Sequence, residues 1–148
     1  MLNKTHIAIG ILTMIIFLKH VVHKWIFVVV FLIATVLPNI DKFIFNSKGA
    51  FLFRPLKTFI HRDLIHSFTF CLIITLFLAF YWPLLAFPFF LGYALHLLAD
   101  AWTVEGIRPF WPLKAVSKGK IEVGGAMEET VFMIFAVLDL IFALTYFL

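Results

Sequence analysis

Five apolar segments separated by short polar turns make up most of this chain, and their number and length restrict the folds that it can adopt. They cover residues 5–18, 25–37, 64–82, 84–100 and 131–148. With 64% hydrophobic and 14% charged residues among 148, the chain has more apolar surface than a soluble domain of this length can bury. We therefore expect a single all-α integral membrane domain, residues 1–148, with about five transmembrane helices.

Breaker residues and segment lengths refine this picture. The first segment has no good small-residue cleavage site, so we expect it to be retained and not removed as a signal peptide. The second segment ends at Pro38, and Pro83 between the third and fourth predicts a tight helical hairpin. The first two segments are shorter than the roughly 20 residues that a complete span needs. Their ends are therefore defined only to within one helical turn.

Threading these segments back and forth across a bilayer distributes the basic residues unevenly. The amino terminus and the loops 38–63 and 101–130 fall on one side. Of the 12 Lys and Arg residues, Lys19 and Lys24 fall on the opposite side, and the other ten are Lys4, Lys42, Lys48, Arg54, Lys57, Arg62, Arg108, Lys114, Lys118 and Lys120. By the positive-inside rule, we expect a multi-pass membrane protein with a cytoplasmic amino terminus. Because these residues are spread over short loops, we expect no nucleic-acid binding.

Residues 92–112 combine an apolar helix with groups that can bind a metal ion. His96 and Asp100 are four residues apart, which on an α-helix places both side chains on one face about one turn apart. Gly106 and Pro109 follow and end the helix. An ionisable pair at the end of such an apolar segment favours a functional site, because burying it without a partner costs several kcal/mol. The alternative is a helix-capping carboxylate beside a solvated histidine.

The same threading brings further ligand-type residues to the cytoplasmic helix ends. The seven candidates are His6, Asp41, His61, His66, His96, Asp100 and Glu128. Four imidazoles with carboxylates suit zinc, manganese or iron better than magnesium or calcium, and the single cysteine, Cys71, excludes a cysteine-based zinc site. Polar residues must end helices in any membrane protein. That requirement does not explain why four histidines from different segments share one side, so we predict a metal centre here.

The spacing of His61 and His66 indicates how the third helix starts. Five residues apart, the two imidazoles would point about 140° away from each other on a regular helix, so the motif is not expected to be wholly helical. We expect Asp63 to cap the helix, His66 to lie in its first turn, and His61 to reach in from the loop.

These motifs, in this order, resemble the YdjM family, which is described as LexA-binding, associated with the inner membrane and predicted to consist of metal-dependent hydrolases. The resemblance extends from Thr5 to about Glu128 and rests on Thr5-His6 with Gly10, Leu37-Pro38-Asn39-Ile40-Asp41, His61-Arg62-Asp63-Leu64-Ile65-His66-Ser67, Gly92-Tyr93 with His96-Leu97-Leu98-Ala99-Asp100, then Thr103, Gly106 and Trp111-Pro112. More remotely, the family is similar to zinc-dependent phospholipase C and P1 nuclease, all-helical enzymes that hydrolyse phosphoesters with clustered zinc ions.

The resemblance implies metal-binding or catalytic roles for six residues. These are His6, Asp41, His61, His66, His96 and Asp100. Gly124 and Glu128 match a later Gly and Glu of the family. The chain departs from the pattern at Asn39, where the family usually has aspartate, and at Asp63 and Ile65, which replace glycine and threonine. Asn39 can coordinate through its carbonyl oxygen but brings no charge, so the number of metal ions stays open.

Together, these observations predict a metal-dependent hydrolase that acts on a phosphoester of a membrane lipid or lipid-linked substrate. Zinc is the expected ion, with manganese or iron as alternatives. Asp41, Asp100 or Glu128 is expected to accept a proton, and Arg62 and Arg108 to hold a phosphate.

Two other classes of protein are compatible with the same residues. A non-enzymatic membrane protein could use the cluster as a structural metal site and present its basic loops to a protein partner. A small transporter is a third alternative, but Asp139 is the one ionisable residue near mid-membrane in the predicted topology, which argues against transport.

Overall fold

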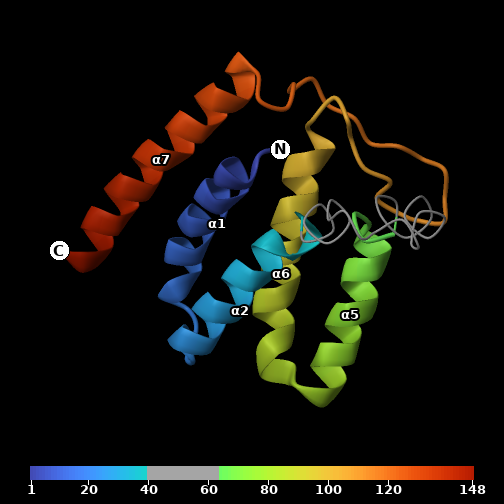
Figure 1. Ribbon diagram of the computed structural model, residues 1–148. Coiled ribbons are helices and arrows are strands. Elements are labelled where there is room, and N and C mark those ends of the chain that lie inside the picture. Colours follow the sequence, from blue (N-terminus) through green and yellow to red (C-terminus); the bar gives the residue numbers. More distant parts are fainter. Residues whose placement is uncertain (40–63) are drawn as a thin grey trace, which may run out of the picture.

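The computed structural model describes residues 1–39 and 64–148, and within these ranges the chain has five α-helices and one short 3₁₀-helix (Figure 1). They are α1 (Asn3–Leu18), α2 (Lys24–Val36), η1 (Leu37–Asn39), α5 (Phe68–Tyr81), α6 (Pro83–Ala101) and α7 (Ala126–Phe147). Each predicted apolar segment corresponds to one of the α-helices. The described residues contain no β-strand, so the expectation of an all-α fold is confirmed for them.

Two helix starts differ from the sequence prediction by more than two residues. α5 begins at Phe68 and not at residue 64, because the hydroxyl of Ser67 accepts a hydrogen bond from the backbone N–H of Phe70 at 3.2 Å and caps the helix. His66 therefore precedes the helix instead of lying in its first turn. α7 begins at Ala126, before the predicted residue 131, and its first turn contains two glutamates, which a helix amino terminus favours.

Length separates α6 from α1, α2 and α5. By length and composition, α6 is the one helix in the described ranges that can cross a membrane, whereas α1, α2 with η1, and α5 are apolar but shorter. The number of transmembrane helices therefore stays a prediction. Large apolar side chains are exposed on the outer faces of the molecule, such as Phe80 on α5 at 82% and Leu140 on α7 at 63%. Apolar surfaces of this kind are typical of contact with lipid or with another protein.

The helices form a row in the order α7, α1, α2, α6 and α5, and the most extensive contacts are between neighbours in this row (Figure 1). The amino-terminal ends of α1, α5 and α7 lie at the same level along the helix axes as the carboxyl-terminal ends of α2 and α6 (Figure 1). This level is called one end of the row. The structure thus brings together the helix ends that the sequence predicts to share one side of a membrane. Which side of a membrane they face stays a prediction.

Glycine lets α2 approach α6 closely. A Cβ atom at Gly92 of α6 would lie 2.5 Å from the carbonyl oxygen of Phe31 and 3.0 Å from Oγ1 of Thr35, both on α2. Because the first distance is too short for any side chain, only glycine allows this approach. Phe31 and Ala34 are fully buried on α2. This packing holds the backbone of α2 against the half of α6 that carries His96.

The loop between α6 and α7 is held by backbone hydrogen bonds across its two arms. Ile107 and Ser117 exchange two N–H to carbonyl bonds of 2.9 Å, and the N–H of Gly119 donates to the carbonyl of Thr103 at 2.9 Å. Gly106, at φ 65°, lies on the first arm between Thr103 and Ile107. A Cβ atom there would lie 2.3 Å from the carbonyl oxygen of Ser117. The loop therefore has a defined conformation at the end of the row where the predicted ligands gather.

Candidate metal centre

Asp100, in the last turn of α6, is the residue on which three imidazoles converge. Its Oδ1 lies 3.2 Å from Nε2 of His6, and its Oδ2 lies 3.2 Å from Nε2 of His96 and 3.7 Å from Nε2 of His66. All four residues are buried, although they come from α1, from the segment before α5 and from α6. The fold therefore assembles the cluster from parts of the chain that are far apart in sequence.

The orientation of the rings directs their nitrogens to one place. His96 and Asp100 share a face of α6, as their spacing of four residues predicts. The ring of His6 stacks on that of His96 with centroids 3.9 Å apart and planes 9° apart. The ring of His66 is tilted by 59° from that of His96 at a centroid distance of 5.6 Å. Parallel stacking lets α1 and α6 present their Nε2 atoms to the same carboxylate.

A hydrogen bond to α2 fixes which nitrogen of His96 carries a proton. Nδ1 of His96 lies 2.8 Å from the backbone carbonyl oxygen of Thr35. Since a carbonyl oxygen only accepts, Nδ1 is the donor, and in the neutral ring Nε2 presents a lone pair. This lone pair and an oxygen of Asp100 then face each other at 3.2 Å in a buried place. A cation bound by both atoms would stabilise the arrangement.

Several buried nitrogens of the cluster have no hydrogen bond. Among the described residues, neither ring nitrogen of His6 nor Nε2 of His96 has a hydrogen-bond partner. The Nε2 atoms of His6 and His96 each lie 3.2 Å from an oxygen of Asp100, within ion-pair distance. The α-amino group of Met1 forms an ion pair with Oδ1 of Asp100, so the carboxylate already attracts positive charge. Unsatisfied buried nitrogens beside a carboxylate indicate a binding site for a cation.

The distances fit a transition-metal ion. Metal–nitrogen and metal–oxygen bonds of about 2.0–2.2 Å place neighbouring ligand atoms roughly 3.0–3.5 Å apart around one ion. The two separations of 3.2 Å between Nε2 and carboxylate oxygens fall in this range. One ligand atom each from His6, His96 and Asp100 can be chosen so that all three lie within 4.8 Å of one another. This mixed nitrogen and oxygen set suits zinc, manganese or iron.

Glu128 has a different environment from the imidazole cluster. Its carboxylate accepts hydrogen bonds from the hydroxyl of Thr5 at 2.9 Å, from the N–H of Leu2 at 2.5 Å and from the N–H of Gly124 at 2.7 Å. Burial acts to raise the pKa of Glu128, but these three donors outweigh it and the pKa is lowered. Glu128 is therefore an ionised group that joins the first turns of α1 and α7.

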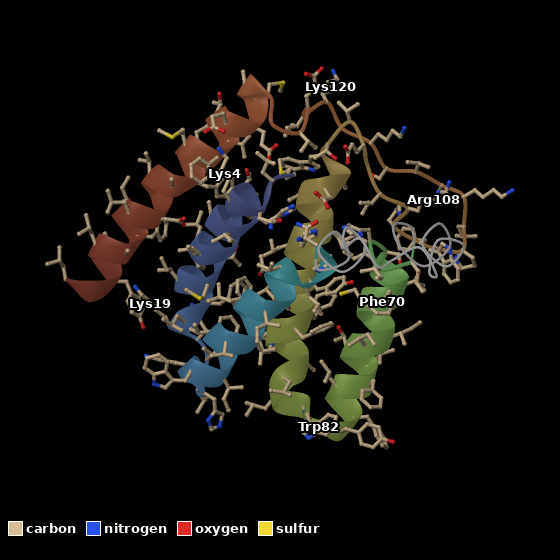
Figure 2. The ribbon with its side chains drawn as sticks, viewed as in Figure 1. Lys4, Lys19, Phe70, Trp82, Arg108 and Lys120 are labelled. Atoms are coloured by element: carbon tan, nitrogen blue, oxygen red, sulfur yellow. The ribbon has the colours of Figure 1, made fainter. Side chains whose placement is uncertain are left out.

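The structure brings together four of the predicted metal ligands: His6, His66, His96 and Asp100. Glu128 lies at the same end of the row, and Arg108 is in the loop after α6 (Figure 2). Asp41, His61, Arg62 and the predicted cap Asp63 lie outside the described residues. The amide nitrogen of Asn39 donates to Oδ1 of Asn3 at 2.8 Å. Its buried Oδ1 accepts no hydrogen bond from the described residues.

Sequence reasoning missed the part that Thr35 plays in the site. It contacts His96 through its backbone carbonyl, which no side-chain pattern reveals. Gly10 and Gly92 were the available signals, because small residues on apolar helices often mark close helix contacts. These glycines predict that α2 lies close to its neighbours, but not which carbonyl reaches the histidine.

Fold and site together define a small all-helical protein with a candidate metal centre buried at one end of its helix row. The family model described as YdjM inner membrane protein matches residues 1–147, and the chain belongs to this family. No curated protein and no solved structure matches the chain. The more remote similarity to zinc-dependent phospholipase C and P1 nuclease stays an expectation.

Proposed function

We propose that this protein is a metal-dependent hydrolase of the inner membrane that cleaves a phosphoester of a lipid or lipid-linked substrate. The observation that carries the proposal is the convergence of His6, His96 and Asp100, with ring nitrogens that have no hydrogen-bond partner in the described ranges. A membrane location is supported by the description of the family, by the length and composition of α6 and by the exposed apolar side chains.

The residues of the site have separable tasks in this proposal. His6, His96 and Asp100 would hold the ion, with His66 at 3.7 Å from Asp100 as a fourth donor. The ion would supply Lewis-acid polarisation of a phosphoryl oxygen and a lowered pKa for water. The carbonyl of Thr35 holds a proton of His96 on Nδ1, so that in the neutral ring the lone pair of Nε2 would be available to the ion.

Proton transfer and phosphate binding involve residues around this core. Asp100, Asp41 and Glu128 are the proposed proton acceptors, and Arg62 and Arg108 the proposed phosphate ligands. Glu128 already accepts three hydrogen bonds, so its contribution would also include holding α1, and with it His6, in position. A proton acceptor must lie within hydrogen-bond reach of the attacking water.

The position of the site favours a lipid substrate. The ligands lie at helix ends, near the level of lipid head groups if the apolar helices are embedded, and Trp102 follows α6 as an exposed interfacial residue. A substrate with an anionic head and an apolar tail would reach this place already oriented.

The experiment is to incubate the reconstituted protein with total lipid extract and with soluble phosphodiesters, and to follow phosphate-containing products with and without added metal. We expect turnover of lipid that is lost on chelation and in Asp100→Asn, which keeps the size of the side chain but removes its charge. Turnover of the soluble compounds alone would reject the lipid assignment and keep the enzyme.

A structural metal site that supports a protein partner is the second candidate. It is favoured by the burial of the ligands and by their origin in α1, α6 and the segment before α5, because an ion there would tie these three parts together. Bound metal and an intact fold without metal-dependent turnover across a broad panel of phosphoesters would support this candidate over the enzyme.

A further inference from the structure

Lysines and large apolar side chains are exposed together on the loop that joins α6 to α7. The loop surface, as we define it, consists of Trp102, Phe110, Leu113, Lys114, Lys118 and Lys120, all exposed. Between Gly106 and Ile121 the sequence contains no acidic residue. The loop surface is therefore basic and apolar at once, which is unusual for a loop that faces only water.

The backbone of this loop is ordered before any partner binds. Ile107 and Ser117 are paired by two hydrogen bonds, and Gly119 packs on Trp102 so closely that a Cβ atom there would lie 2.0 Å from the carbonyl oxygen of Trp102. Trp102 is thereby held against the stretch between Lys118 and Lys120. A preformed surface loses little conformational entropy when it binds.

The loop surface is attached directly to the candidate metal centre. The hydroxyl of Thr103 donates to the carbonyl of Asp100 at 2.7 Å, and the carbonyl of Pro109 accepts from the N–H of Phe68, close after His66. Figure 2 shows Lys120 at this end of the row and Lys19 at the other. A partner bound here would therefore lie next to the metal ligands.

We propose that the loop surface binds anionic phospholipids of the surrounding bilayer and concentrates their phosphates beside the metal centre. This inference rests on the membrane location in the proposed function and identifies the class of lipid that the site meets. Trp102, Phe110 and Leu113 insert among the acyl chains and ester groups, where tryptophan is favoured.

The lysines supply the preference for negative charge. Lys114, Lys118 and Lys120 contact lipid phosphates from the water side, and each basic residue near an anionic surface increases binding about fivefold. The exposed large apolar side chains of α5, α6 and α7 favour lipid as the occupant, and the loop joins the ends of α6 and α7 (Figure 1).

Trp102 can report on the test. The full chain with Trp25→Phe, Trp82→Phe and Trp111→Phe has Trp102 as its single tryptophan. It is reconstituted in phosphatidylcholine vesicles, and quenching of Trp102 fluorescence by brominated phosphatidylglycerol is compared with quenching by brominated phosphatidylcholine. The two curves give the relative affinity of the loop surface for anionic and neutral lipid. Circular dichroism and thermal unfolding check that each variant is folded.

We expect stronger quenching by the anionic lipid, and a loss of this preference at high salt and in the Lys114→Gln, Lys118→Gln, Lys120→Gln variant. The matched control is Lys19→Gln with Lys24→Gln at the opposite end, which should keep the preference. Equal quenching by both lipids in the parent protein, or an equal loss in the control, would overturn the proposal. Absence of quenching by either lipid would reject it in favour of a surface for a protein partner.

The outcome is independent of catalysis. If the protein prefers anionic lipid at Trp102 but hydrolyses nothing, the lipid-binding role of the loop surface is supported and the proposed hydrolase activity is rejected. If the protein hydrolyses lipid without this preference, the hydrolase activity is supported and the lipid-binding role of the loop surface is rejected.

Discussion

At the scale of single residues, the hydrogen bond between His96 and the carbonyl of Thr35 gives the cluster its chemical character. It holds the proton on Nδ1 and turns the lone pair of Nε2 toward Asp100. In the structure the α-amino group of Met1 is paired with this carboxylate, while Nε2 of His96 has no hydrogen-bond partner among the described residues and is available to a metal ion. The stability of the folded protein should therefore depend on metal more strongly than the stability of a protein with a solvated surface site.

We predict that chelation lowers the melting temperature of the parent protein but hardly that of His96→Ala or His66→Ala. Binding to the folded state alone adds about 2.7 kcal/mol at a hundredfold excess of ligand over Kd. His20→Ala is the matched control, since His20 is exposed at the opposite end and should leave the response unchanged. An equal response to chelation in all four proteins would show that His66 and His96 are not ligands.

Glu128 provides a second test at the residue scale. In Glu128→Gln, the neutral amide presents an NH₂ group to at least one of the three donors that now face a carboxylate oxygen. We expect a loss of about 1–3 kcal/mol in the free energy of unfolding, measured by thermal or denaturant melting. Metal content should be largely retained, because these contacts are with α1 and the start of α7.

The neighbouring Glu129 is the control for this change. It is exposed and pairs with Lys4 on the surface, so Glu129→Gln should change stability by less than about 1 kcal/mol. If Glu128→Gln melts like the parent protein but loses metal-dependent turnover, Glu128 acts in the chemistry and not in holding the helices.

At the scale of helices, the contact between α2 and α6 positions the site from a distance. Gly92 lies one turn before His96 and allows the backbone of α2 to approach closely enough for Thr35 to reach the imidazole. Gly92→Ala should push the helices apart, cost about 1–3 kcal/mol of stability and weaken metal binding. Isothermal titration with zinc and melting curves measure both effects. Leu98→Ala, on an exposed face of the same helix, should leave zinc affinity unchanged.

The helices also show what the sequence can and cannot predict. Long apolar runs predict all five α-helices of the described residues, because burial of such runs favours backbone hydrogen bonding within each segment. The predicted start of α5 at residue 64 was wrong. The residue that caps a helix depends on local hydrogen-bond geometry, here that of Ser67, and not on apolar periodicity. The spacing of His96 and Asp100 predicts their shared face, since it depends on one helix alone. The stacking of His6 on His96 requires the packing of α1 and α6, which the sequence does not specify.

At the scale of the whole molecule, each of the five described α-helices packs mainly on its neighbours in the row. α7 packs mainly on α1, and α5 mainly on α6, so these two outermost helices expose apolar side chains. The candidate centre is at one end because helix directions alternate along the chain, which brings the start of α1 beside the end of α6. Basic residues of the loop surface lie at this end, whereas Lys19 and Lys24 lie at the other.

This asymmetry predicts the orientation of the protein in the membrane. Under the positive-inside rule, the end with the loop surface is cytoplasmic and the end with Lys19 is outside. A membrane-impermeant thiol reagent added to intact cells should therefore label a cysteine at His20 or Leu148 but not one at Lys118, all three of which are exposed positions. The background variant Cys71→Ala removes the native thiol, which is fully buried. Lysis of the cells should make Lys118→Cys reactive and so show that the site itself is accessible. Labelling of His20→Cys and Lys118→Cys from the same side would mean that the helices between them do not cross the bilayer as an alternating series, and the metal centre would then have no assigned side.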